Sequence, residues 1–276
     1  MQMNNRLLIP IVLLVLFTAC EDKLEDPTLS SYTPIHKTKL NRIDILYNNV
    51  PNGPFEDYYY DDQQRLWKIE INGSSTPTTR HQITFVDEII NSLTVTNFPA
   101  APPLSTLTDH YAVTYSQDVI TLRRPDTRTI KITTENGYIN SYQFISHNGI
   151  DKTIFERDES DNIKTIRYIK TPVSEPEEVR REDIFSTYSD LTNPYNLFNP
   201  NSGFGFFDSE IISLLGLKIS NKVPLSYSKW YIDDDEGVLE NKDIEVISIE
   251  NNILREYKIK SHINEGDYWF YKLSYN

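Results

Sequence analysis

TIKITTENGYINSYQF, residues Thr129–Phe144, is the stretch of sequence that decides the fold. Isoleucines alternate with polar residues through Ile130 and Ile132, and apolar and polar residues alternate again up to Phe144. Two such runs on either side of the turn sequence Glu135–Gly137 predict a β-hairpin with one buried face.

The phase of the two runs selects the length of the turn. A two-residue Asn-Gly loop would place Ile132 opposite Ser141, with the two apolar sets on opposite faces. A three-residue loop places Ile130 opposite Tyr142 on one face, and it puts Gly137 at the left-handed position of a type I turn with a bulge. The sequence therefore predicts the three-residue loop.

Most of the chain repeats this unit. The final run, Tyr268–Tyr275, is aromatic on one face, and such a strand needs a partner to avoid an exposed edge. We expect it to close the sheet against an early strand. Thr171–Asp183, with two prolines and clustered charge, is expected to be a surface loop. The other predicted strands and hairpins are Leu40–Tyr47, Tyr58–Ile69, Gln82–Thr96, Tyr111–Arg123, Lys152–Lys170, Ile184–Tyr188, Trp230–Leu239 and Ile244–Ile259.

One helix interrupts the meander. Ser209–Leu215 is apolar at Ile211, Ile212, Leu214 and Leu215, and Gly216 provides the stop. The segment before the helix carries five aromatic side chains, and burial of each is worth about 1.5–3 kcal/mol. We expect this segment and the helix to pack into or across the mouth of the sheet, either as a plug or as the rim of a ligand groove. The aromatic residues of this possible binding rim are Tyr195, Phe198, Phe204, Phe206 and Phe207.

Composition agrees with a single β domain spanning residues 38–276. Of 276 residues, 38% are hydrophobic, 24% charged and 12% aromatic, which favours a folded chain rich in sheet. The predicted fold class is all-β, an antiparallel meander of hairpins curved into a half-barrel or small barrel, with one short helix packed against it. A transmembrane barrel is rejected because several strands carry charge on both faces, for example Lys131 and Arg167.

Residues 1–19 have the pattern of a lipoprotein signal peptide. Arg6 precedes the apolar run Leu7–Phe17, which is too short for a spanning helix of about 20 residues. Cys20 is the only cysteine and stands where such signals place the lipid-modified residue. The alternative is an ordinary secretory signal with an incidental thiol. The sequence predicts a lipid-anchored exported protein, attached to the membrane through Cys20.

The chain is acidic, with a formal net charge of −13. An acidic domain is repelled by phosphate backbones, so no nucleic-acid partner is expected. Residues 20–37 are interpreted as a flexible tether, acidic over Glu21–Asp26. That acidic run also resembles the export signals that send Bacteroidota lipoproteins to the cell surface. The expected location is the outer membrane, on the cell surface or the periplasmic face.

Several motifs resemble a family of gut Bacteroidota lipoproteins of unknown function. They are the signal sequence around Cys20, the YYYDDQQRL turn of Tyr58–Leu66, the run Tyr188–Tyr195, and Leu214–Gly216 followed by Ser220–Lys222. The hairpins are also similar to the tyrosine–aspartate repeats of large secreted bacterial proteins. The family is described as having a porin-like, curved β fold, so the resemblance implies a fold and a location. It implies no catalytic residues.

No motif for catalysis, metal binding or a cofactor is present, and none of the three is expected. The five histidines form no HxH or HExxH pair. Asp233–Gly237 and Asp158–Asn162 are rich in oxygen ligands but lack the spacing of an EF-hand loop. We interpret both as solvated hairpin turns, with calcium binding as the alternative.

Three classes of function remain open. The first is non-catalytic binding of a glycan or an envelope partner, in which the many tyrosines together with Trp67, Trp230 and Trp269 could supply a stacking platform or simply form sheet core. The second is a hydrolase whose carboxylates meet only in the folded chain. The third is a structural envelope component without a small ligand. The first is the predicted function, and the protein is not expected to be an enzyme.

Overall fold

The computed structural model describes residues 39–48, 53–73, 77–86, 88–99, 105–173, 176–193, 209–231, 238–261 and 267–276. Within these ranges the chain forms sixteen β-strands and one short α-helix. Their bounds are β1 (Leu40–Tyr47), β2 (Phe55–Tyr60), β3 (Leu66–Asn72), β4 (Pro77–Val86), β5 (Ile89–Asn97), β6 (Leu107–Ser116), β7 (Val119–Arg123), β8 (Thr129–Glu135), β9 (Tyr138–Ser146), β10 (Gly149–Arg157), β11 (Ile163–Pro172), β12 (Glu178–Thr192), α1 (Ser209–Leu214), β13 (Lys222–Tyr231), β14 (Val238–Glu250), β15 (Ile253–Ser261) and β16 (Tyr268–Tyr275).

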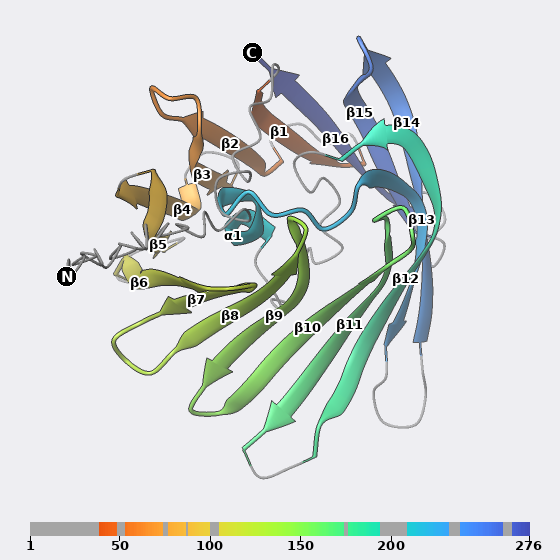
Figure 1. Ribbon diagram of the computed structural model, residues 1–276. Coiled ribbons are helices and arrows are strands. Elements are labelled where there is room, and N and C mark those ends of the chain that lie inside the picture. The colour runs from red at the N-terminus through yellow and green to blue at the C-terminus, as the bar shows by residue number, and fades with distance from the viewer. Residues whose placement is uncertain are drawn as a thin grey trace, which may run out of the picture.

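The strands form one closed antiparallel barrel (Figure 1). Each strand pairs with its neighbours in sequence, and β16 pairs with β1 from Leu40–Tyr275 to Tyr47–Trp269. The predicted all-β meander and the closing role of the last strand are confirmed. The sheet goes further than the expected half-barrel or small barrel, because pairing between the first and last strands removes both edges.

The two ends of the barrel differ. The plug end carries Lys39, Asn276, short turns such as Asn136–Gly137, and the segment between β12 and β13 that contains α1. Lys39 and Asn276 exchange backbone hydrogen bonds there, with N···O distances of 3.4 and 2.9 Å. The opposite, loop end carries the connections β1–β2, β3–β4, β5–β6, β13–β14 and β15–β16.

The hairpin of β8 and β9 differs from its predicted register. Ile132, and not Ile130, lies opposite Tyr142. The loop has two residues, Asn136 and Gly137, with positive φ angles of 50° and 85°, which is the pattern of a type I′ turn. A bulge next to Thr133 then shifts the register by one residue. The predicted three-residue loop was wrong, but Ile130, Ile132 and Tyr142 do share the buried face because the bulge restores the phase.

The bulged hairpin is the docking point for the chain that follows α1. Ile139 N donates to Lys218 O at 3.0 Å, and Lys218 N donates to Gly137 O at 2.9 Å. Arg157 of β10 donates to Ile219 O at 3.1 Å, to Asn140 Oδ1 at 2.9 Å, and to Ile139 O. Burial lowers the pKa of Arg157 to about 10. One guanidinium therefore ties the plug segment to the barrel wall.

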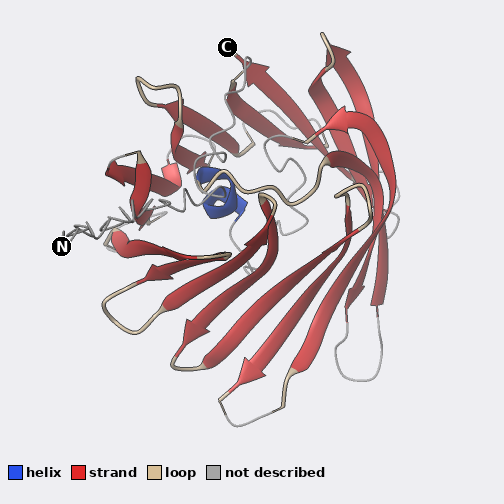
Figure 2. Ribbon diagram, in the orientation of Figure 1, coloured by secondary structure: helices blue, strands red, loops and turns tan. Residues whose placement is uncertain are grey.

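Helix α1 lies inside the ring of strands and contacts β3 and β4 (Figure 2). The helix ends at Leu214, one residue before the predicted limit at Leu215, and Gly216, with φ +71°, follows as the predicted stop. Ile212 and Leu215 are buried, as predicted. They belong to one hydrophobic cluster formed by the inward-facing side chains of almost every strand. Barrels of sixteen strands usually leave a wide lumen, whereas this lumen holds a packed core.

Part of the predicted surface loop Thr171–Asp183 is strand. β11 continues to Pro172 and β12 begins at Glu178, so the connection between them is short. Arg181 and Asp183 of this run are fully buried inside the barrel. The charges were interpreted as a solvated loop because charged residues are seldom buried unless they are paired, and here they are paired with each other.

Candidate functional site

The site residues predicted from sequence lie outside the described residues. These are the lipid-attachment residue Cys20 and the rim aromatics Tyr195, Phe198, Phe204, Phe206 and Phe207. Helix α1, which follows the aromatic segment, is buried in the barrel interior. Candidate sites among the described residues are therefore built below from side-chain geometry.

The outer wall of the barrel is polar. Cross-strand register aligns Arg42, Asp57, Glu70 and Arg80 in one outward row across β1 to β4. On the opposite wall, Arg167 forms ion pairs with Glu156 at 2.6 Å and with Glu182 at 2.7 Å. A membrane-spanning barrel requires an outward apolar band about 25 Å tall. The described outer wall has rows of charge where that band would lie.

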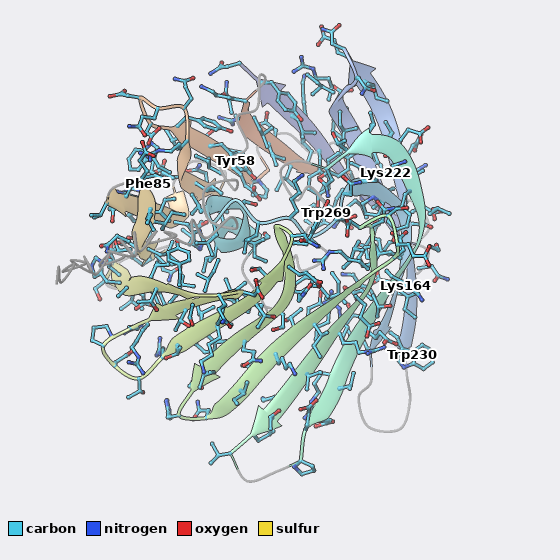
Figure 3. All side chains as sticks on the ribbon, in the orientation of Figure 1. Tyr58, Phe85, Lys164, Lys222, Trp230 and Trp269 are labelled. Carbon is cyan, nitrogen blue, oxygen red and sulfur yellow. The ribbon has the colours of Figure 1, made fainter. Side chains whose placement is uncertain are left out.

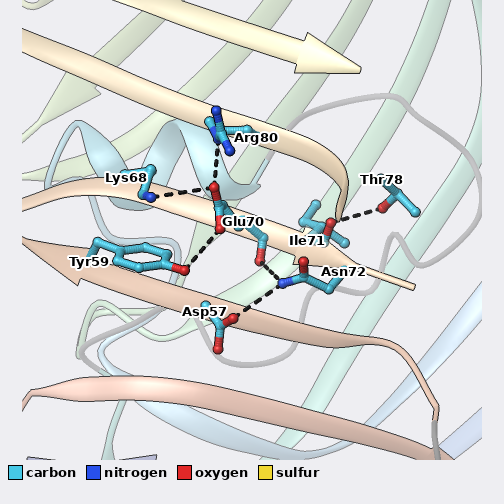
Figure 4. Close-up of polar contacts among 8 residues, drawn as sticks. All are labelled: Asp57, Tyr59, Lys68, Glu70, Ile71, Asn72, Thr78 and Arg80. Carbon is cyan, nitrogen blue, oxygen red and sulfur yellow. Dashed lines mark hydrogen bonds and ion pairs between the residues drawn. The ribbon is translucent and has the colours of Figure 1, made fainter. Parts of the chain in front are cut away.

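Glu70 shows how these outer charges are held (Figure 4). Its carboxylate accepts hydrogen bonds from Arg80 Nε at 2.6 Å and Tyr59 Oη at 2.9 Å, and it lies 3.4 Å from Lys68 Nζ. Burial alone would raise the pKa of Glu70, but the hydrogen bonds from Tyr59 and Arg80 outweigh it and lower the pKa. Such a network is suited to a water-facing wall.

The barrel interior contains an inner charge cluster, formed by Arg181, Asp183, Lys229, Glu240 and Lys242. Arg181 donates to Asp183 from Nε at 2.7 Å and from a terminal nitrogen at 2.5 Å, and the two side chains are 1% and 0% exposed. In the strand register Lys229 lies between Asp183 and Glu240, and Glu240 pairs with Lys242. The cluster is thus a row of alternating charge across β12, β13 and β14.

Solvent exposure increases along this row. Lys229 is 6% exposed, and the side chains of Glu240 and Lys242 are each 15% exposed. Burial, together with the positive charge of Arg181, lowers the pKa of Lys229 to about 8. Buried ion pairs add little stability, and perturbed pKa values gather at functional sites, so the cluster is a candidate site. In the sequence, the visible sign of this cluster is the pair of opposite charges at Arg181 and Asp183, two residues apart and so on one face of β12.

A second candidate is the loop-end aromatic pair, Tyr47 and Trp269. Their ring centroids are 5.0 Å apart, and the side chains are 41% and 37% exposed. Asp267 lies beside them, and a hydrogen bond to it raises the pKa of Tyr47. Asn48 donates from Nδ2 to Asp267 Oδ1 at 3.0 Å and fixes that carboxylate. Exposed aromatic faces beside a positioned carboxylate can stack on a sugar ring and bind its hydroxyl groups.

The three tryptophans do not form one platform. Trp67 packs against the hydrophobic core. Trp230, 39% exposed, projects from the outer side of β13 (Figure 3). Trp269 lies at the loop end with Tyr47. Of the three tryptophans in the stacking surface considered from the sequence, Trp269 is the one that lies with an exposed tyrosine, Tyr47.

The predicted solvated turn at Asp158–Asn162 is ordered by its own carboxylate. Asp158 Oδ1 accepts the backbone N–H groups of Ser160 and Asn162, both at 2.9 Å. These bonds lower the pKa of Asp158 although its partial burial would raise it. No group of three potential metal ligands occurs among the described residues, and Asp233–Gly237 lies outside them. In the same part of the chain no helix is both long and apolar enough to cross a membrane.

Comparison with known proteins gives structural likeness alone. No protein-family model matches the sequence, and no curated protein matches it. A porin-like protein from Bacteroides uniformis aligns with a TM-score of 0.42 at 11% identity, over 86% of this chain and 96% of that one. A porin-like protein from Bacteroides vulgatus aligns with a TM-score of 0.47 at 10% identity, over 86% and 98%. Both scores lie below 0.5, so neither likeness identifies a function.

The buried Arg181–Asp183 pair makes a stability prediction. Asp183→Asn leaves the guanidinium buried without its counter-charge, so the free energy of unfolding should fall by about 3–5 kcal/mol. The control is Glu182→Gln, one residue away on the outer wall, where the expected change is within about 1 kcal/mol. Urea unfolding measures both. Similar, small losses in the two variants would contradict the assignment.

The lowered pKa of Lys229 predicts an unusual pH dependence of the free energy of unfolding. Its pKa is about 8 in the fold against an ordinary 10.5, so the folded state binds fewer protons than the unfolded state over this interval. Deprotonation of Lys229 should therefore contribute a rise of about 2 kcal/mol to the free energy of unfolding between about pH 7.5 and pH 9.5. Buried tyrosines such as Tyr115, with a pKa of about 12, act in the opposite direction as the pH approaches the ordinary tyrosine value of about 10, so the effect of Lys229 is measured as the difference from a variant that lacks the amine.

Lys229→Met is the control for that prediction. Replacing the amine with an apolar side chain of similar length should remove the contribution of Lys229. The other charges facing this position (Arg181, Asp183, Glu240 and Lys242) remain, so the difference between the two proteins belongs to the amine. Chemical unfolding at a series of pH values measures the effect. Parallel profiles in the unmodified protein and the variant would show that Lys229 is not the responsible group.

Proposed function

We propose that this chain is a lipid-anchored protein of the bacterial envelope that binds a glycan without catalysing a reaction. The observation that carries the proposal is the exposed pair of Tyr47 and Trp269 beside the fixed carboxylate of Asp267. A carboxylate in an acidic protein favours neutral sugars over anionic ones. The proposed ligand is therefore a neutral oligosaccharide.

The barrel is proposed to stand in water and not in the lipid bilayer. The outward rows of charge on β1 to β4 and around Arg167 support this, because a lipid-facing wall would be apolar. The packed interior, with α1 and the hydrophobic cluster inside the ring, supports a solid barrel more than a conducting pore.

The position of Lys39 decides where a tether from the proposed anchor at Cys20 would join the barrel. Lys39, which leads back toward Cys20, lies at the plug end beside Asn276. The loop-end aromatic pair lies at the opposite end of β1 and β16. A tether from Cys20 would therefore join the barrel at the plug end, on the cell-surface or periplasmic face of the outer membrane, and the aromatic pair at the opposite end would be available to a partner.

Two other functions receive less support. A hydrolase would need available carboxylates, whereas Asp183 is sealed against Arg181, and Glu240 pairs with Lys242. A purely structural envelope component would gain nothing from a pair of aromatic rings that are about 40% exposed.

Membrane attachment can be tested at the proposed lipid site. Cys20→Ser removes the sulfur that would carry the lipid, so the variant should leave the membrane fraction and appear in the soluble fraction. Because the outer wall is polar, it should stay soluble without detergent. Unchanged membrane fractionation of the variant would contradict the anchor.

Glycan binding can be tested with two tryptophan variants of equal exposure. In the Cys20→Ser protein, Trp269→Ala should weaken binding to neutral oligosaccharides by about tenfold, equal to about 1.4 kcal/mol of lost stacking. Trp230→Ala, on the outer wall of β13, should leave binding unchanged. A glycan array followed by titration calorimetry measures both. No binding across the array, or equal losses in the two variants, would reject the proposed site.

A further inference from the structure

β15 and β16 separate before they reach the plug end. Their ladder runs from Lys260–Tyr268 to Glu256–Lys272 and ends there, although β15 begins at Ile253 and β16 continues to Tyr275. Figure 1 shows the two strand ends apart at this end of the barrel. The barrel wall therefore has a wedge-shaped split between residues 253–255 and 273–275.

Each side of the split is held by its other neighbour. β16 stays on β1, with Ser274 opposite Arg42 and Tyr275 opposite Leu40. β15 stays on β14, with Leu254 opposite Ile249, across register shifts on both sides of Ser248. Paired bulges bend strands and are frequent next to binding sites. The split is thus built into the strand pairing and does not arise from frayed ends.

The split forms an open, shallow pocket of about 310 Å³ on the barrel surface. Leu273 and Tyr275 provide its apolar surface, and four charged side chains and Ser274 complete the lining. Those four are Arg255, Lys272, Glu250 and Glu256, two of each sign. The volume is at the lower limit for small-molecule sites.

Arg255 is the best-positioned of the charged groups. Its guanidinium lies 4.9 Å from the ring centre of Tyr275, and one terminal nitrogen is 2.9 Å from Glu250. Its Nε is buried and makes no hydrogen bond. A buried N–H that donates to nothing is uncommon, and a ligand acceptor near the guanidinium would satisfy it after a small rotation of the side chain.

We propose that this split binds a short peptide, in extended conformation, through its free carboxylate. A strand of two or three residues, at about 3.3 Å per residue, would continue the interrupted sheet between β15 and β16. Arg255 and Lys272 would bind the terminal carboxylate, and Glu256 the ammonium group, while Glu250 stays paired with Arg255. The proposal is independent of glycan binding, since the aromatic pair lies at the opposite end of the barrel.

The lining distinguishes a peptide from other small ligands. A simple anion would use the two cations but would be repelled by the two carboxylates in the same pocket. A sugar would need an open aromatic face, and the ring of Tyr275 is already covered by Arg255. A zwitterion with backbone hydrogen-bonding groups uses the charges of both signs and the strand edges together.

The experiment is titration calorimetry of the Cys20→Ser protein with trialanine, trialanine amide and acetate. Trialanine should bind at least about fivefold more tightly than its amide, and acetate should not bind at ~10 mM. Lys272→Gln, an exposed position that should fold normally, should weaken trialanine binding about fivefold, as should Arg255→Gln. Lys260→Gln, on β15 outside the split and paired with Glu245, is the matched control and should bind as the parent does.

Three results would overturn the proposal. They are no heat from trialanine, equal affinity for the acid and the amide, or equal binding by Lys272→Gln and Lys260→Gln. Acetate binding as tightly as trialanine would assign the pocket to small carboxylates and reject the peptide. Thermal unfolding of each variant separates loss of binding from loss of the fold.

Discussion

Pairing of β1 with β16 is the constraint on which the rest of the molecule depends. A meander of sixteen strands has two edges, and each would present a row of unpaired backbone groups to solvent or to other chains. The register from Leu40–Tyr275 to Tyr47–Trp269 removes both edges at once and fixes the circumference of the barrel. A closed ring of that size then has to be filled, and α1 with its flanking residues occupies the interior.

The polarity of the two faces follows from this filling. Inward positions are mostly isoleucine, leucine and tyrosine because they contact a packed core, and outward positions carry charge because they contact water. The inner charge cluster is the exception to this pattern. It brings Arg181, Asp183 and Lys229 into the interior, where desolvation is expensive, and a packed apolar core would have been at least as stable.

Sequence patterns were sufficient for the local hairpins and for the closing strand, because period-two alternation is a direct record of which face is buried. They failed where one residue changes the phase. The bulge that follows Asn136–Gly137 lies where Lys218 and Arg157, which are far away in the sequence, contact the hairpin. They failed again at Arg181 and Asp183, since only the folded sheet shows that these charges neutralise each other inside. Only part of the aromatic pair could be predicted. Trp269 is a candidate by residue type, but its contact with Tyr47 forms only when β1 pairs with β16.

Pairing of the first and last strands next to the chain ends, at the plug end, has a mechanical consequence. Lys39 and Asn276 lie side by side at the plug end, and β1 and β16 are antiparallel. A force that separates the two chain ends would break the hydrogen-bonded pairs of this ladder one after another, beginning at Lys39–Asn276. Strands pulled along their length would instead resist with all their bonds together. The β1–β16 ladder is therefore easier to open by pulling the chain ends apart than by pulling along its strands, and the split lies on the other side of β16.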